Sequence, residues 1–255
     1  MLVKVGCCGF PVKRSVYAAH LSVVEVQQTF YEPPRLSSVR QWRTEMPPEF
    51  EFTLKAWQLI THEPRSPTYR RLKTMLTPEE LLQAGGFKPT GVVRRAWEVT
   101  REMALALHAR VILFQCPASF APSPENIENL RRFFEEVDRG GWLLAWEPRG
   151  AWPREEVAQL CRELQLIPAL DPWATPPIPG PVAYFRLHGL KGYRYSYTEA
   201  DLHKLINFLT QQKEAYVFFN NMSMWEDARR FSQLFSEKFL NPPPSSPASG
   251  GRGLG

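Results

Sequence analysis

The sequence has no long apolar run and no recognisable targeting segment. None of its apolar stretches approaches the roughly 18 residues that a membrane-spanning helix needs. The first residues, MLVKVGCCGF, lead directly into a strand-like pattern and lack the layout of a signal peptide. We therefore expect a cytoplasmic protein with no membrane partner.

Cysteine and histidine are scarce, with four and five residues respectively in a chain of 255. The cysteines form neither a disulfide framework nor a paired C-x-x-C zinc pattern, so we expect reduced thiols. They are Cys7, Cys8, Cys116 and Cys161. A multi-zinc site needs more histidines than this chain places at its predicted strand ends. No metal is predicted, and the sequence identifies no cofactor.

The chain does have the composition of a folded domain. Hydrophobic residues make up 44% and charged residues 22%, which is ordinary for a globular protein. The net charge of +5 and the pI near 9.1 are compatible with a phosphate-bearing or nucleic-acid partner. The tail at 241–255 is rich in Pro, Ser and Gly and is predicted to be disordered.

Eight short apolar runs alternate with helical segments, which is typical of βα units around a parallel sheet. The runs are 2–8, 23–27, 50–56, 111–115, 142–147, 166–170, 182–188 and 215–220. Helix-start signals stand at Ser123, Pro153 and Thr198. We predict a single-domain (β/α)8 TIM-like barrel over 1–240, with an insertion at about 63–91 as a candidate lid.

Polar residues follow nearly every predicted strand. The carboxyl ends of barrel strands face one way, and a polar group there costs desolvation unless a partner or ligand compensates it. The candidate substrate-binding residues are Lys55, Thr61, His62, Gln115, Arg149, Asp171, Arg186, Tyr193, Tyr195, Asn220 and Asn221. The alternative is a closed ion-pair network of Glu25, Lys55, Glu147 and Arg186.

Three residues are candidate catalytic groups. Glu25 and Glu147 are suited to act as acid and base, or as nucleophile and acid. His188 is the preferred proton shuttle, ahead of His62. The alternatives are a fixed ion pair of Glu147 with an arginine, and a buried histidine bonded to a carbonyl.

A cationic set and several aromatic residues favour an anionic ligand that contains a ring. Lys55, Arg149 and Arg186 are suited to a phosphate or carboxylate. The aromatic residues, which are suited to stacking or to loop packing, are Phe30, Tyr31, Trp152, Tyr193, Tyr195 and Tyr197.

Motifs at the strand ends carry a family resemblance. They are Val24-Glu25-Val26-Gln27-Gln28-Thr29-Phe30-Tyr31, Ile60-Thr61-His62 after Lys55, Gln115-Cys116-Pro117-Ala118-Ser119-Phe120, Trp146-Glu147-Pro148-Arg149, Arg186-Leu187-His188-Gly189, Tyr193-Arg194-Tyr195-Ser196-Tyr197 and Phe219-Asn220-Asn221. In this order they resemble the domain-of-unknown-function 72 (YecE-like) family over nearly all of 1–240. The resemblance implies a barrel fold and no settled activity.

The chain departs from that family pattern at four places. Cys8-Gly9-Phe10 stands where Ser-Gly-Trp is common, and Gln27 stands in place of Asn. The loop after Arg149, at Gly150, is one residue shorter, and Met222 replaces a His.

We interpret the chain as a possible hydrolase acting on an anionic phosphate- or sugar-containing substrate. The alternative is a nucleic-acid-binding or repair-associated protein without turnover, and a further one is a ligand-sensing barrel. A short separation of two carboxylates across a cleft favours bond cleavage, and a basic stripe beyond the mouth favours nucleic acid.

Overall fold

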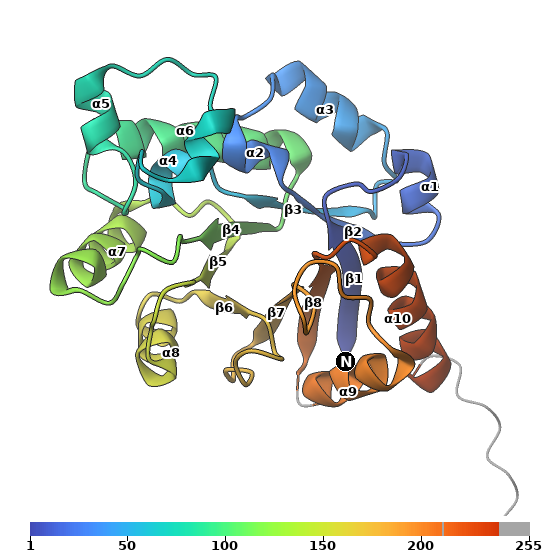
Figure 1. Ribbon diagram of the computed structural model, residues 1–255. Helices are drawn as coiled ribbons and strands as arrows, with labels where there is room; N and C mark the ends of the chain where they lie inside the picture. Colours follow the sequence, from blue (N-terminus) through green and yellow to red (C-terminus); the bar gives the residue numbers. More distant parts are fainter. Residues whose placement is uncertain (211, 240–255) are drawn as a thin grey trace, which may run out of the picture.

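The computed structural model describes residues 1–210 and 212–239, which form a closed barrel of eight parallel strands in sequence order (Figure 1). The strands are β1 (Leu2–Cys8), β2 (Val23–Val26), β3 (Glu51–Lys55), β4 (Val111–Gln115), β5 (Leu143–Glu147), β6 (Ile167–Leu170), β7 (Val182–Leu187) and β8 (Glu214–Phe219). The predicted (β/α)8 TIM-like barrel is confirmed. The predicted disordered tail lies outside the described residues.

Two of the predicted strands have the observed bounds, and the other six differ by one residue at one or both ends. Gln27, His188 and Asn220 were predicted to end strands but instead begin the loops that follow them. Loop residues do not follow the alternation of side chains along a strand, so the conformation of each loop sets the direction of these three side chains.

Helices surround the strands on the outside of the barrel (Figure 1). They are α1 (Arg14–Ala18), α2 (Gln28–Tyr31), α3 (Leu36–Thr44), α4 (Gln58–Thr61), η1 (Pro67–Arg71), α5 (Pro78–Gln83), α6 (Gly91–Leu107), α7 (Pro124–Glu136), α8 (Arg154–Glu163), α9 (Glu199–Leu209) and α10 (Met224–Phe239). Ser123 Oγ accepts from the Asn126 amide at 3.1 Å, and Thr198 forms a capping box with Asp201. Helix α8 begins directly after Pro153. All three predicted helix starts are confirmed.

Two cores result from the alternation of side chains along the strands. The larger core lies between the strands and the helices, and a smaller one fills the barrel interior with residues such as Val23, Leu113, Ala145 and Tyr184. Gly6 keeps the interior closed, because a Cβ there would lie 2.2 Å from the Val23 carbonyl oxygen.

The segment between α4 and α6 carries η1 and α5, and it is fixed to the loop after β2. The Glu32 carboxylate accepts from the backbone amides of Lys73 at 3.0 Å and Thr74 at 3.2 Å. Arg71 stacks over the ring of Tyr31, 3.5 Å from its centroid. The segment therefore borders the carboxyl end of β2, and its role as a lid stays a prediction. None of the helices in 1–210 and 212–239 is long and apolar enough to cross a membrane.

Candidate active site in the barrel mouth

The period of two along each strand continues from the barrel interior into its mouth. Polar residues lie two positions after an inward-facing residue in five strands, β2, β3, β4, β5 and β7. They are Glu25 after Val23, Lys55 after Thr53, Gln115 after Leu113, Glu147 after Ala145 and Arg186 after Tyr184. All five are buried. The last inward layer of the barrel is therefore polar and charged.

Arg186 is the centre of this layer, and its side chain is fully buried. Its Nη2 donates to Glu25 Oε1 at 2.8 Å, and its Nη1 donates to Glu147 Oε2 at 2.5 Å. Nη1 also lies 3.3 Å from Gln115 Oε1, and Nε lies 3.1 Å from both Glu25 oxygens. All three guanidinium nitrogens are thus engaged, and Arg186 binds the protein's own carboxylates instead of presenting free donors to a ligand.

Both carboxyl groups are held ionised by this arrangement. Burial by itself raises the pKa of Glu25 and of Glu147, but the guanidinium of Arg186, together with the other donors and cations around each carboxylate, outweighs it, and the pKa of each is lowered. A group with a lowered pKa is a poor general acid at neutral pH. The geometry favours the alternative of an ion-pair network, in which Glu25 and Glu147 anchor Arg186, and a catalytic role for the two carboxylates stays a prediction.

Glu25 has further donors that complete its coordination. Tyr184 Oη donates to Oε2 at 2.7 Å, Cys8 Sγ lies 3.2 Å from Oε1, and Gln27 Nε2 also donates to Oε1. Burial and the neighbouring carboxylate raise the pKa of the Cys8 thiol, so it stays protonated and acts as a donor. Tyr184 was not among the predicted site residues, although its position two residues before Arg186 on β7 was available as a signal.

Lys55 is outside the ion-pair network. Its side chain is 4% exposed, and its Nζ lies 3.5 Å above the centroid of the Phe30 ring. The amine makes no hydrogen bond or ion pair with any residue of the described ranges. Burial and, after it, the charge of Arg186 lower the pKa of Lys55 to about 7, although Glu147 and Glu25 oppose both effects. The mouth therefore contains an amine that is partly neutral near pH 7.

We expect Lys55→Met to stabilise the fold most strongly at low pH. The folded-state pKa of about 7 lies below the ordinary 10.5, so below pH 7 the amine is charged in both states and the full cost of burying that charge is present. Between pH 7 and 10.5 the lysine is neutral in the folded state and charged in the unfolded state, so the free-energy cost of burying the amine shrinks as the pH rises. A tenfold change in proton affinity corresponds to about 1.4 kcal/mol, so lowering the pKa from 10.5 to about 7 corresponds to a gain at pH 6 of about 5 kcal/mol. Urea unfolding at pH 6 and 9.5 checks it, and a gain that does not change with pH contradicts it.

A second group of polar side chains joins β5, β6 and β7 at the mouth. Arg149 Nε donates to Glu147 Oε1 at 3.0 Å, and its Nη2 lies 2.6 Å from His188 Nε2. His188 Nδ1 lies 3.6 Å from Asp171 Oδ2. Asp171 is fixed by two backbone amides, from His188 at 3.0 Å and from Trp173 at 3.1 Å. These four residues form one continuous chain, which we call the Asp171–Glu147 relay.

The relay lines a hollow of about 520 Å³ between the ends of β5, β6 and β7. This volume is within the range of small-molecule sites, roughly 300–1,000 Å³. Gly150 allows the short loop after Arg149 to pass close to the loop between β4 and α7, because a Cβ there would lie 2.7 Å from the Phe120 carbonyl oxygen. Trp152, on the wall of the hollow, donates to that same oxygen at 2.6 Å. The relay therefore faces an open, pre-formed cavity.

Four other predicted site residues, Thr61, His62, Tyr195 and Asn221, belong neither to the Arg186 network nor to the relay. Thr61 Oγ1 lies 2.8 Å from His62 Nδ1, and burial lowers the pKa of His62 to about 3, so the imidazole is neutral. Asn221 Nδ2 donates to the Tyr195 carbonyl oxygen and to Asp227 Oδ2, each at 2.7 Å, and the Tyr195 hydroxyl donates to Asp201. Asn221 and Tyr195 thus fix the loop after β7 to α9 and α10. The Asn221 Nδ2 and the Tyr195 hydroxyl are occupied by the protein, whereas the buried Asn221 Oδ1 has no hydrogen-bond partner among the described residues.

Gln27, Asn220 and Tyr193 line a separate groove on the other side of the mouth. Tyr193 is 56% exposed, and the exposed Met222 beyond Asn220 donates its backbone amide to the Tyr193 carbonyl oxygen. The other walls of this groove come mostly from loops and helices that carry no strand-end signal. Apart from Tyr31, one of the aromatic residues named as suited to stacking, these positions were not predicted.

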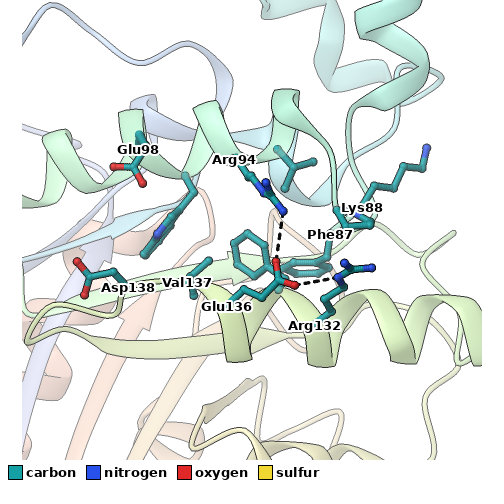
Figure 2. Close-up of a pocket in the computed structure, with 12 residues that line it drawn as sticks. Phe87, Lys88, Arg94, Glu98, Arg132, Glu136, Val137 and Asp138 are labelled. Atoms are coloured by element: carbon teal, nitrogen blue, oxygen red, sulfur yellow. Dashed lines mark hydrogen bonds and ion pairs between the residues drawn. The ribbon is translucent and has the colours of Figure 1, made fainter.

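A further hollow, of about 320 Å³, lies between α6 and α7 on the outside of the barrel (Figure 2). Phe87 and Trp97 lie in its floor, and Glu136 accepts from Arg132 at 2.9 Å and Arg94 at 3.5 Å. None of the predicted site residues lines it. Because its charged side chains are already in ion pairs, with one another or with Glu63 and Arg101 outside the hollow, we assign the site to the mouth.

No group of three or more His, Cys, Asp or Glu side chains in the described part of the chain is arranged to hold a metal ion.

Comparison with known families decides the family. Residues 12–249 match the model described as a protein of unknown function, DUF72. The chain belongs to the DUF72 family. The resemblance read from the strand-end motifs is therefore confirmed. Comparison with curated protein sequences gave no match.

Solved structures of DUF72 members share the barrel. A DUF72 family protein from Thermotoga maritima is 25% identical with a TM-score of 0.68, covering 93% of this chain and 100% of that one. A DUF72 family protein from Enterococcus faecalis V583 is 20% identical with a TM-score of 0.68, covering 95% and 96%. Endonuclease IV from Thermus thermophilus is 11% identical with a TM-score of 0.51, covering 94% and 100%. The likeness to the last two shows the fold alone.

Proposed function

We propose that this DUF72 barrel is a hydrolase that acts on an anionic phosphate- or sugar-containing substrate in the hollow beside β5, β6 and β7. The observation that carries this proposal is the Asp171–Glu147 relay, in which a histidine with a carboxylate 3.6 Å from its Nδ1 faces a pre-formed cavity beside an arginine. A base, a group that orients it and an anion-binding cation in one cavity are the minimum set for hydrolysis.

The contacts of His188 support its role as the base. Nε2 accepts from Arg149, which places the imidazole proton on Nδ1, the nitrogen that faces Asp171. When a substrate anion draws Arg149 away, Nε2 is left open to take a proton from an attacking water molecule. The imidazolium that forms is stabilised by Asp171 and then returns its proton to the leaving oxygen.

Arg149 is suited to hold the anion. Its side chain is 38% exposed, and Nη1 makes no hydrogen bond within 1–210 and 212–239. Glu147 holds the opposite edge of the guanidinium through Nε. Lys55 adds positive charge to the mouth when it is protonated, whereas the charge of Arg186 is balanced by Glu25 and Glu147. In this proposal Lys55 assists by its field, Arg149 is the direct ligand, and Arg186 holds Glu147 in place.

The experiment is hydrolysis of p-nitrophenyl phosphate, bis(p-nitrophenyl) phosphate and p-nitrophenyl glycosides by the wild type and His188→Asn. Loss of a positioned base should lower kcat/KM for the accepted ester by about 10²- to 10⁴-fold. The matched control is His203→Asn, since His203 is exposed on α9 and lines none of the mouth cavities. Equal rates for the wild type and His188→Asn, or no turnover of any of these phosphate esters and glycosides, would contradict the proposal.

Nucleic-acid binding without turnover is the second candidate, and the groove lined by Tyr193 favours it together with the net charge of +5. Salt-dependent binding of an oligonucleotide, with no hydrolysis of any ester, would support this candidate over the first.

A further inference from the structure

The groove lined by Gln27, Asn220 and Tyr193 lies across the ends of β1, β2 and β8 and has a volume of about 650 Å³. We call it the β1–β8 groove. It adjoins the relay hollow at the end of β7. His188 follows Leu187, whose carbonyl oxygen accepts from the backbone amide of Asn220 at 2.9 Å. The groove and the hollow therefore lie on the two sides of one strand end.

The walls of the β1–β8 groove combine aromatic rings with arginines. Arg71 stacks on Tyr31 at 3.5 Å from the ring centroid, and Arg14 lies 5.9 Å from the Trp42 ring. Arg14 is paired with Glu45, whereas Arg71 is exposed and has no ion-pair partner among the described residues. Tyr193, which also lines the groove, is 56% exposed. Such walls bind planar rings by stacking and bind an attached anion through the open arginine.

The floor of the groove carries two carboxamides that have hydrogen-bonding capacity left over. Gln27 uses its Nε2 on Glu25, and its Oε1 has no donor in the described part of the chain. The half-buried side chain of Asn220 makes no hydrogen bond in that part. A carboxamide presents a donor and an acceptor side by side, which matches the paired donor and acceptor on the edge of a nucleobase.

From these observations we infer that the β1–β8 groove is a nucleobase subsite, and that the anion bound in the mouth is a nucleotide, free or within a strand. The base would stack between Tyr193 and the Arg71–Tyr31 pair, with its edge towards Asn220 and Gln27. Gln27 connects the subsite to Glu25 and hence to the Arg186 network. The choice of substrate class rests on the proposed function, whereas binding of the base does not.

The experiment is isothermal titration of the full chain with three probes: adenosine 5′-monophosphate, adenosine and ribose 5-phosphate. The subsite predicts that both base-bearing probes bind, and that ribose 5-phosphate binds about tenfold or more weakly than the nucleotide, because stacking is lost. Arg71→Ala with Tyr193→Ala should remove that advantage. Arg70→Ala is the matched control, since Arg70 is exposed on the same turn η1 and does not line the groove.

Equal affinity for the nucleotide and ribose 5-phosphate would overturn the inference, and so would nucleotide binding that the double variant leaves unchanged. A short single-stranded oligonucleotide distinguishes the two sources of the base. Tighter binding of the oligonucleotide, lost in the double variant, assigns the subsite to a strand, and equal affinity assigns it to a free nucleotide. Both results support the subsite.

The same variants separate this inference from the proposed function. If nucleotide binding depends on Arg71 and Tyr193 but no substrate is hydrolysed, the nucleobase subsite is supported and the proposed hydrolase is contradicted. If hydrolysis depends on His188 but the protein shows no preference for a base, the hydrolase is supported and the subsite is contradicted.

Discussion

Arg186→Met is expected to lower the free energy of unfolding by about 3–5 kcal/mol, because it leaves two buried carboxylates without their cation. Methionine fills much of the arginine volume, so the loss comes from charge more than from a cavity. Glu25 and Glu147 should respond by taking up protons, and the stability of the variant should improve as the pH falls through their raised pKa values. Urea unfolding at pH 5 and 8 measures both effects.

The matched control is Arg132→Met, which removes an exposed pair with Glu136 on α7 and should cost less than about 1 kcal/mol. The triple variant Glu25→Gln, Glu147→Gln and Arg186→Met removes the charges together and should recover most of the lost stability. If Arg186→Met alone were as stable as the wild type, the buried ion-pair network would not be what stabilises the barrel mouth.

Asp171→Asn is expected to lower kcat of the accepted ester by about 10²- to 10⁴-fold and to leave KM nearly unchanged, because the aspartate orients His188 without touching the substrate. Both Asp171 oxygens accept backbone amides, from His188 and from Trp173. An asparagine has to turn its NH2 towards one of those donors, so the loop after β6 also loses about 1–3 kcal/mol. Steady-state kinetics and thermal unfolding of the same preparation separate these two effects.

Asp138→Asn is the control for this change, since Asp138 is an exposed aspartate that also accepts a backbone amide, from Gly140 at 2.9 Å. It should lose little stability and no activity. A loss of kcat in Asp171→Asn that is matched by an equal rise in KM would place the aspartate in substrate binding instead of histidine orientation.

Some site residues could be predicted from the sequence and others could not, and their positions relative to the strands explain the difference. Glu147 and Arg186 were predictable because each continues an inward-facing register that starts in an apolar strand. Asn221 was predicted on the same rule and lies elsewhere, because it falls one residue beyond Asn220 in a loop, where the register no longer fixes direction.

The sequence by itself determined the barrel, the helix starts and the polar inward layer, because these depend on local alternation and capping that neighbouring residues supply. Only the tertiary structure decided which groups pair. Arg186 joins Glu25 from 161 residues away and Glu147 from 39, and it leaves Lys55 without a partner among the described residues. Likewise, Arg71 and Tyr193 meet in one groove although neither ends a strand. Such pairings arise from closure of the barrel and the course of its loops, which no local pattern of residues encodes.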